Sequence, residues 1–155
     1  MKTPFPLHPG KRHLPAVTDP AEYAAYVHTR APGATLAGFV ALVLVYQRTL
    51  LAHITTHYVT RPLEGWVREE LHVLDNGGGR RIGACGGFGP GAPAAALIVG
   101  QLIALGTRRI ITLGTAAALH PDSGPGDAVL GDSALRDEGL SHHCLPPGRT
   151  ARPER

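Results

Sequence analysis

The sequence predicts an α/β fold with a parallel β-α-β unit at its centre, and two observations carry this prediction. Residues 82–118 follow the order strand, glycine-rich turn, helix, strand and small-residue turn. A second apolar run rich in β-branched residues, residues 39–46, predicts another buried strand upstream. Because a β-α-β connection makes its strands parallel, both turns are expected at the carboxyl edge of the sheet, where such sheets bind ligands.

Glycine and proline mark the boundaries of the elements in this unit. The turn at residues 86–91 contains four glycines and tolerates positive φ at three or more positions. Pro93 suits the first turn of a helix, where its missing N–H is not needed, and Gly106 suits the position just past a helix end. The predicted elements are a strand at 82–85, the turn at 86–91, a helix at 94–105, a strand at 110–113 and a turn at 114–118.

Local signals predict the elements on either side of this unit. Asp19 is placed to cap a helix that begins with Pro20 and runs to about Arg30. Residues 75–79, with Asp, Asn and three glycines, predict a hairpin turn between two strands. The other expected elements are an N-terminal arm at 1–17, a strand at 39–46, a helix at 47–57, a loop at Arg61 and Pro62, hairpin strands at 66–74 and 80–85, short strands at 127–130 and 133–136, irregular chain from Asp137, and a disordered tail at 149–155.

Composition favours a single globular domain over residues 1–155. The chain is 43% hydrophobic and 17% charged, with a formal net charge of +3. No basic stripe with interleaved aromatic residues is present, so no nucleic-acid partner is expected. The N-terminus lacks the apolar core of a signal peptide, and the apolar run at 36–46 is shorter than the roughly 20 residues that span a bilayer. We therefore expect a cytoplasmic protein without a membrane partner, whose Cys85 and Cys144 stay outside any disulfide.

Two features at the predicted sheet edge have both a functional and a structural interpretation. The turn at 86–91 suits an anion because it precedes a helix, but it suits a tight turn equally well. It lacks the acidic residue of a dinucleotide-binding fingerprint and the Gly-Lys-Ser/Thr of a Walker loop. Arg48 follows a buried strand at the ligand-binding edge, where its guanidinium suits phosphate, although a helix-start arginine facing water is the alternative.

Histidine and charge clusters elsewhere favour structural interpretations. His53 and His57 are four residues apart on a predicted helix, but a metal site needs a third ligand. The Ser-His-His-Cys segment at 141–144 is interpreted as a loop, and the charge run at 136–138 as a solvated surface. No metal site is expected from these residues.

The motifs over residues 80–148 resemble the nucleoside phosphorylase family, in particular its uridine phosphorylase-like branch. That branch carries a glycine-rich turn before an alanine-rich helix, a Leu-Gly pair, a strand ending in a Gly-Thr turn, a loop ending in Gly-Asp, and the pattern Arg-Asp-Glu-Gly-x-Ser-x-His. The matching residues are, in order, 87–93, Leu105 with Gly106, Leu113 to Thr115, Gly126 with Asp127, and Arg136 to Gly139 with Ser141, His142 and His143. The resemblance is looser but traceable over residues 8–79.

This resemblance implies a fold, an activity and an assembly. The fold would be a three-layer phosphorylase-type α/β sandwich with a mixed central sheet, of which this chain is a C-terminally truncated portion. The activity would be phosphorolysis of a nucleoside, a pyrimidine such as uridine rather than a purine, to free base and pentose 1-phosphate. Inorganic phosphate would be the co-substrate, with no metal or organic cofactor. Family members form dimers stacked into hexamers, so a homodimer or homohexamer is expected.

The resemblance also assigns binding roles residue by residue, but no catalytic residue. Phosphate would be held by Arg48, by Thr115 and by Arg61, the last lent across a dimer interface. The ribose and base would be contacted by His8, Thr115, Ala116 and Ala117. Thr112 stands where the family often has an arginine, which favours an alternative, a nucleosidase of the same fold that uses water. A further alternative is a non-catalytic truncated remnant or a nucleoside- or phosphate-binding module.

Overall fold

The computed structural model describes residues 8, 10–68, 70–75 and 77–153. The chain divides into two compact units, one formed by residues 17–115 and the other by residues 1–16 together with 116–155. The elements of the first unit are α1 (Pro20–Arg30), β1 (Ala41–Val45), α2 (Arg48–His57), β2 (Thr60–Pro62), β3 (Glu70–Asp75), β4 (Arg81–Gly86), α3 (Ala92–Ala104) and β5 (Ile110–Leu113).

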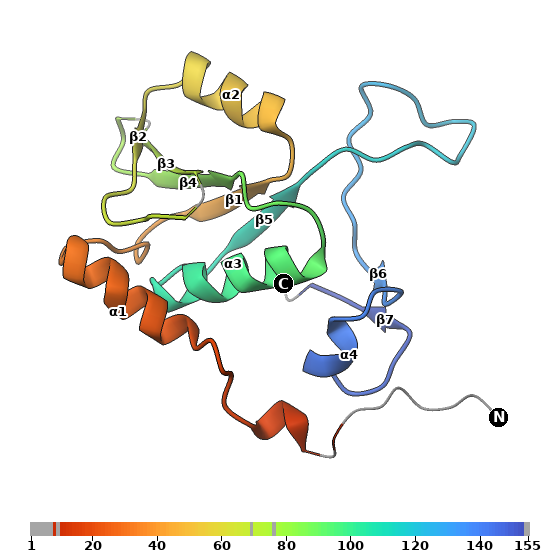
Figure 1. Ribbon diagram of the computed structural model, residues 1–155. Helices are drawn as coiled ribbons and strands as arrows, with labels where there is room; N and C mark the ends of the chain where they lie inside the picture. The colour runs from red at the N-terminus through yellow and green to blue at the C-terminus, as the bar shows by residue number, and fades with distance from the viewer. Residues whose placement is uncertain (1–7, 9, 69, 76, 154–155) are drawn as a thin grey trace. The chain divides into compact units, whose positions relative to one another are not determined.

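The larger unit is a mixed five-stranded sheet with helices on both faces (Figure 1). The strand order is β2-β3-β4-β1-β5. The central strand β1 runs parallel to β4 and to β5, whereas β3 is antiparallel to β4 and β2 is antiparallel to β3. Helix α2 covers one face, and α1 and α3 pack together on the other. The predicted α/β class with a mixed sheet is therefore confirmed.

Strand β1 is apolar throughout because both of its faces are covered. Leu42 and Leu44 are fully buried in the core on the side of α1 and α3, whereas Val45 packs with Leu51 of α2 in a smaller core on the opposite face. Burial of each leucine side chain is worth about 1.5–3 kcal/mol relative to exposure. The continuous apolar run is thus the signature of a strand enclosed between two layers, as the sequence predicts.

Capping contacts confirm the predicted start of α1 and the glycine stop after α3, whereas α3 begins at Ala92, two residues before the predicted helix. The Ala21 N–H donates to Asp19 Oδ1 at 2.8 Å, and Pro20 occupies the first position of α1. Gly106 follows the end of α3 with φ of 103°, and its N–H donates to the Ile103 carbonyl at 2.9 Å. A Cβ on Gly106 would lie 3.0 Å from the Ala37 N, so both the left-handed backbone and the packing require glycine there.

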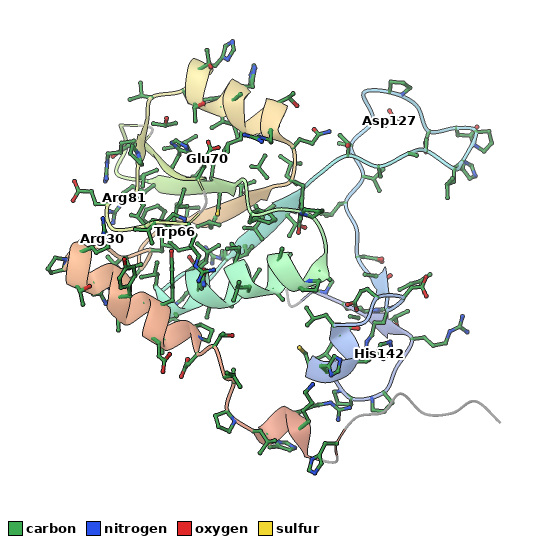
Figure 2. The ribbon with its side chains drawn as sticks, viewed as in Figure 1. Arg30, Trp66, Glu70, Arg81, Asp127 and His142 are labelled. Atoms are coloured by element: carbon green, nitrogen blue, oxygen red, sulfur yellow. The ribbon has the colours of Figure 1, made fainter. Side chains whose placement is uncertain are left out.

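Two predicted strand assignments are wrong, and the strand expected at 66–74 begins only at Glu70. Arg61 and Pro62, expected in a loop, belong to β2, where Arg61 pairs with Val73 at the edge of the sheet. An edge strand tolerates proline because the missing N–H can face solvent. Residues 127–130, expected as a strand, have no regular structure. Their apolar side chains do not pack against a core, since Val129 and Leu130 are 86% and 96% exposed. Asp127 instead closes a loop by accepting the Gly124 N–H at 2.8 Å (Figure 2).

The second unit contains the short elements η1 (Lys11–His13), β6 (Ala134–Leu135), α4 (Ser141–Cys144) and β7 (Thr150–Ala151). The expected strand near 133–136 is present as β6, whereas the chain after Asp137, expected to be irregular, forms α4 and then β7, which pairs antiparallel with β6. The expected disordered tail at 149–155 therefore includes a strand. In the expected N-terminal arm at 1–17, residues 1–7 and 9 lie outside the described residues.

Candidate functional site

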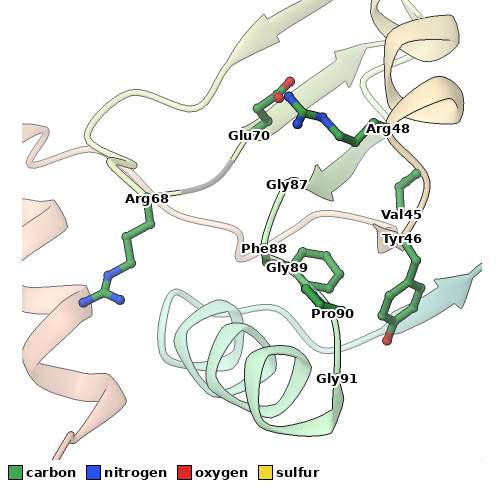
Figure 3. Close-up of a pocket in the computed structure, with 10 residues that line it drawn as sticks. All are labelled: Val45, Tyr46, Arg48, Arg68, Glu70, Gly87, Phe88, Gly89, Pro90 and Gly91. Atoms are coloured by element: carbon green, nitrogen blue, oxygen red, sulfur yellow. The ribbon is translucent and has the colours of Figure 1, made fainter.

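A pocket of about 660 Å³ opens at the carboxyl ends of β1 and β4, the edge that the β-α-β pattern predicts (Figure 3). Three segments form it: the end of β1 with the start of α2, the glycine-rich turn after β4, and the chain that enters β3. The lining residues are Val45, Tyr46, Arg48, Arg68, Glu70, Gly87, Phe88, Gly89, Pro90 and Gly91.

The glycine-rich turn keeps its shape through positive φ angles and close packing. Gly87, Gly89 and Gly91 have φ of 75°, 79° and 96°, which confirms the predicted left-handed positions. Just before them, a Cβ on Gly86 would lie 2.8 Å from Leu51 Cδ2. Gly91 precedes α3, and among the described residues no side chain caps this 13-residue helix, so the N–H groups of its first turn other than at Pro93 are available beside the pocket.

Arg48 and Glu70 face each other across the pocket (Figure 3). Arg48 is the first residue of α2, and its exposed side chain extends over the sheet edge. Glu70 is the first residue of β3 and pairs with Gly86, so the antiparallel register brings the start of β3 to the same edge as the end of β4. Its carboxylate also lies 3.7 Å from His72 Nε2. The guanidinium of Arg48 and the carboxylate of Glu70 are therefore both present in the pocket.

Aromatic side chains form the wall next to α3. The Tyr46 ring meets the Phe88 ring edge-to-face, with centroids 5.2 Å apart and planes at 78°. Phe88 is buried, whereas Tyr46 remains 45% exposed. A Cβ on Gly114 would lie 3.5 Å from the Tyr46 ring, so the turn after β5 passes close to this wall. An apolar wall opposite charged groups suits a ligand with a flat apolar part and a polar part.

Thr115 is joined to this edge through Gln47. The Gln47 Nε2 donates to Thr115 Oγ1 at 2.8 Å, which links the residue before Arg48 to the turn that follows β5. Thr115 itself is exposed and does not line the pocket. Of the three predicted phosphate ligands, Arg48 and Thr115 are thus brought to the same sheet edge.

Arg61 lies apart from Arg48. It is exposed on β2 and lines a separate cleft of about 370 Å³ together with Arg30, Arg81 and Glu64. Within one chain, the structure therefore does not bring Arg61 to the pocket that holds Arg48. The guanidinium of Arg68 lines that pocket at its margin but points toward α1, where it lies 5.6 Å from the Tyr23 ring centroid (Figure 3).

The remaining predicted ligands belong to the second unit. His8 is exposed, and its carbonyl accepts the Lys11 N–H at 3.1 Å. Ala116 and Ala117 are exposed and irregular. Within the part of the chain that the structure describes, no side-chain contact assigns a binding role to His8, Ala116 or Ala117.

The histidine pair on α2 forms a local contact. The rings of His53 and His57 stack with centroids 3.9 Å apart, and His57 Nδ1 lies 2.9 Å from the His53 carbonyl. Among the described residues, no group of three His, Cys, Asp or Glu side chains is arranged to hold a metal ion. Across the same residues, every helix is too short or too polar to cross a bilayer.

The fold and the pocket define an α/β protein with an anion-suited edge of parallel strands. Comparison with known proteins identifies the group: residues 50–153 match the model described as the phosphorylase superfamily, so the chain belongs to that superfamily. A segment of 58 residues is 36% identical to a uridine phosphorylase from Haemophilus influenzae (strain ATCC 51907 / DSM 11121 / KW20 / Rd). The segment covers 37% of this chain and 23% of that relative, so the match spans about a quarter of the relative's length. The resemblance to nucleoside phosphorylases is thereby confirmed.

Sequence reasoning missed Glu70 and Gln47 as residues of this edge. Glu70 follows only from the register with β4, which is centred on Gly78 and pairs Glu70 with Gly86, whereas a turn centred at 77 would have paired residue 70 with residue 84. Gln47 lies two residues beyond the end of β1, and Thr115 lies two residues beyond the end of β5. If β1 and β5 are neighbouring parallel strands, these equal distances predict that the two residues lie side by side.

Proposed function

We propose that this chain forms the phosphate-binding part of a nucleoside phosphorylase that acts on a pyrimidine nucleoside such as uridine. The observation that carries the proposal is the meeting of Arg48, the glycine-rich turn and the Gln47–Thr115 pair at one sheet edge. Membership of the phosphorylase superfamily and the partial match to a uridine phosphorylase support it.

In this mechanism the sheet edge that carries Arg48, the glycine-rich turn and Thr115 holds phosphate and positions it beneath the sugar. Arg48 offers paired N–H donors to the phosphate oxygens, Thr115 offers its hydroxyl, and the turn offers backbone N–H groups. A phosphate oxygen forms a bond to the anomeric carbon while the carbon–nitrogen bond breaks, and the base leaves with the electron pair and takes up a proton. The reaction is accelerated because the site holds the phosphate anion in position before the bond to the anomeric carbon forms. The flat Tyr46–Phe88 wall is suited to the base or sugar.

Arg61 and His8 fit this proposal as residues that serve a second copy of the chain. Arg61 is exposed on the edge strand β2 and does not line the pocket of its own chain. An exposed arginine on an edge strand is available to a phosphate held by a partner in a homodimer or homohexamer. His8 would reach the partner's ribose in the same way.

The test is the dependence of base release on phosphate. We expect uracil release from uridine to saturate with phosphate, and Arg48→Ala to raise the phosphate KM by about 10- to 100-fold, since a hydrogen bond to a charged group contributes about 1.5–3 kcal/mol. Arg108→Ala is the matched control, because Arg108 is exposed on the same unit and lies outside the pocket. Equal effects of the two substitutions would contradict the proposed role of Arg48.

Thr112 supports one rival function. It lies on β5, three residues before Thr115, where the resemblance leads us to expect a phosphate-binding arginine. A nucleosidase of this fold would release uracil at the same rate with and without phosphate. A binding module would show calorimetric binding of phosphate or uridine with no turnover during long incubation. Each outcome excludes the phosphorylase proposal for this chain.

A further inference from the structure

We propose that Gln47 is a positioning residue that turns the Thr115 hydroxyl into a directed donor for phosphate. This inference rests on the proposed function, because it concerns how the same edge holds the anion. It adds a residue for which neither the superfamily match nor the relative provides a role.

The topology places the two side chains opposite each other. Strands β1 and β5 are parallel neighbours in which Val45 pairs with Leu113. Two residues beyond that pair, the chain reaches Gln47 on one strand and Thr115 on the other. The Tyr46 N–H donates to the Leu113 carbonyl at 3.2 Å, which holds the two strand ends together beyond the ladder. The hydrogen bond between Gln47 and Thr115 at 2.8 Å therefore joins two backbones that are already fixed.

Gln47 gives up a helix-capping contact to make this bond. It occupies the N-cap position of α2 with an extended backbone, yet its side chain makes no capping hydrogen bond. The first N–H groups of α2 are left without a side-chain acceptor, beside Arg48. Both the side chain and the helix end are then arranged as donors, which suits a site for an anion.

The direction of the hydrogen bond decides its effect. A threonine hydroxyl has one donor and two acceptor lone pairs. When the Gln47 N–H occupies one lone pair of Thr115 Oγ1, the hydroxyl hydrogen cannot point toward Gln47 and is available to another acceptor. Phosphate offers only acceptors at its ionised oxygens, so the bond matches the hydroxyl to the anion. The amide N–H also polarises the hydroxyl and strengthens its donation.

Two substitutions at position 47 separate this role from packing. Gln47→Met keeps the length of the side chain and removes the donor, and we expect the phosphate KM to rise about 5- to 10-fold with the uridine KM unchanged. Gln47→Glu replaces the donor with an acceptor that would take the Thr115 hydroxyl hydrogen, so its phosphate KM should rise further than that of Gln47→Met. In a Thr115→Val background, Gln47→Met should add no further increase. A Gln47→Glu variant with normal phosphate KM would overturn the inference.

A second measurement keeps the result separate from the fate of the proposed function. In the chain of residues 1–155, the side-chain NH₂ resonances of Gln47 should shift when Thr115 is changed to valine, and should stay in place when the exposed Thr56 on α2 is changed to valine. If the unmodified chain shows no saturation with phosphate, the proposed function and the inference both fail. If it saturates, but Gln47→Met has a normal phosphate KM or the NH₂ resonances do not respond to Thr115→Val, the inference alone is overturned.

Discussion

Arg136, Glu138 and Ser141 hold one another through a compact set of hydrogen bonds. Arg136 Nε donates to Ser141 Oγ at 3.0 Å and its Nη2 donates to the Ser141 carbonyl at 2.8 Å. The Glu138 carboxylate accepts the backbone N–H groups of Leu140 and Ser141 at 2.7 and 3.1 Å. The charge run at 136–138, which the sequence predicts to be solvated surface, therefore supports the first turn of α4. The prediction failed because the order of charges does not show which backbone groups the side chains contact.

These contacts predict a pH dependence for α4. The Ser141 hydroxyl, and then the Ser141 backbone N–H, hold the pKa of Glu138 below its ordinary value. A pKa that is lower in the folded chain means that the stabilisation is complete above the ordinary glutamate range and is lost as the pH falls through the lowered pKa. We expect the amide resonances of Leu140 and Ser141 to move in that acidic window.

Two variants check the assignment of this transition. Glu138→Gln should abolish the acid-induced movement of the Leu140 and Ser141 amides, because the carboxylate that titrates is gone. Asp137→Asn removes the neighbouring carboxylate and should leave the movement intact. A transition that follows Asp137 instead would show that the charge on Glu138 does not support α4.

Individual pocket residues differ in how far the sequence predicts them. Arg48 could be predicted, because a basic residue directly after a buried strand has only one edge of the sheet to occupy. Glu70 could not be predicted in the same way, because a strand at 66–74 leaves open which residue reaches the edge until the register with β4 is known. The hydrogen bond between Gln47 and Thr115 needs the pairing of β1 with β5, which no local pattern specifies.

Helices and central strands follow from the sequence because their signals are local and mutually consistent. The proline and capping aspartate of α1, the glycine after α3 and the two-sided apolar run of β1 each have one structural solution. Elements β2 and β7 and the irregular chain at 127–130 were beyond prediction, because each depends on whether a distant partner is present. Three residues of β2 are a strand only because β3 lies beside them.

The end of α3 provides a stability prediction at the scale of one element. Gly106→Ala would combine a strained positive φ with a Cβ 3.0 Å from the Ala37 N and 3.1 Å from its Cβ. Gly79→Ala would place a Cβ in open space at a positive φ of 73°, so its cost is one of backbone conformation without a steric contact. We expect a loss of about 1 kcal/mol in the free energy of unfolding for Gly79→Ala and about 2–4 kcal/mol for Gly106→Ala.

Urea unfolding followed by far-UV circular dichroism measures both values. The difference between the two variants combines the contact with the Ala37 segment and the larger positive φ at Gly106. Equal losses would mean that the Ala37 backbone moves aside without cost, and that the glycine is needed for its conformation only.

The two compact units each contain one cysteine, which allows their opening to be measured separately. Cys85 on β4 is completely buried in the 17–115 unit, whereas Cys144 on α4 is exposed in the other. We expect one thiol to react rapidly with Ellman's reagent in the native chain, and the second to react only as the 17–115 unit unfolds. Reaction of both thiols at the same rapid rate would contradict the buried position of Cys85.

Single substitutions assign the two phases of this reaction. Cys144→Ser should remove the rapid phase and leave the slow phase unchanged. Cys85→Ala should remove the slow phase, with a loss of stability because a buried side chain becomes smaller. The urea dependence of the slow phase then reports the surface exposed by the 17–115 unit.

The division into units also sets an order of events during synthesis. Residues 17–115 are contiguous, so every residue of this unit is synthesised before residue 116 is added. The other unit joins both ends of the chain: Lys11 Nζ lies 2.8 Å from His143 Nδ1, across 132 residues. At roughly 5–20 residues per second, the 40 residues from 116 to 155 take about 2–8 seconds to be made. All strands of the β2-β3-β4-β1-β5 sheet are therefore synthesised seconds before the last residues of the other unit.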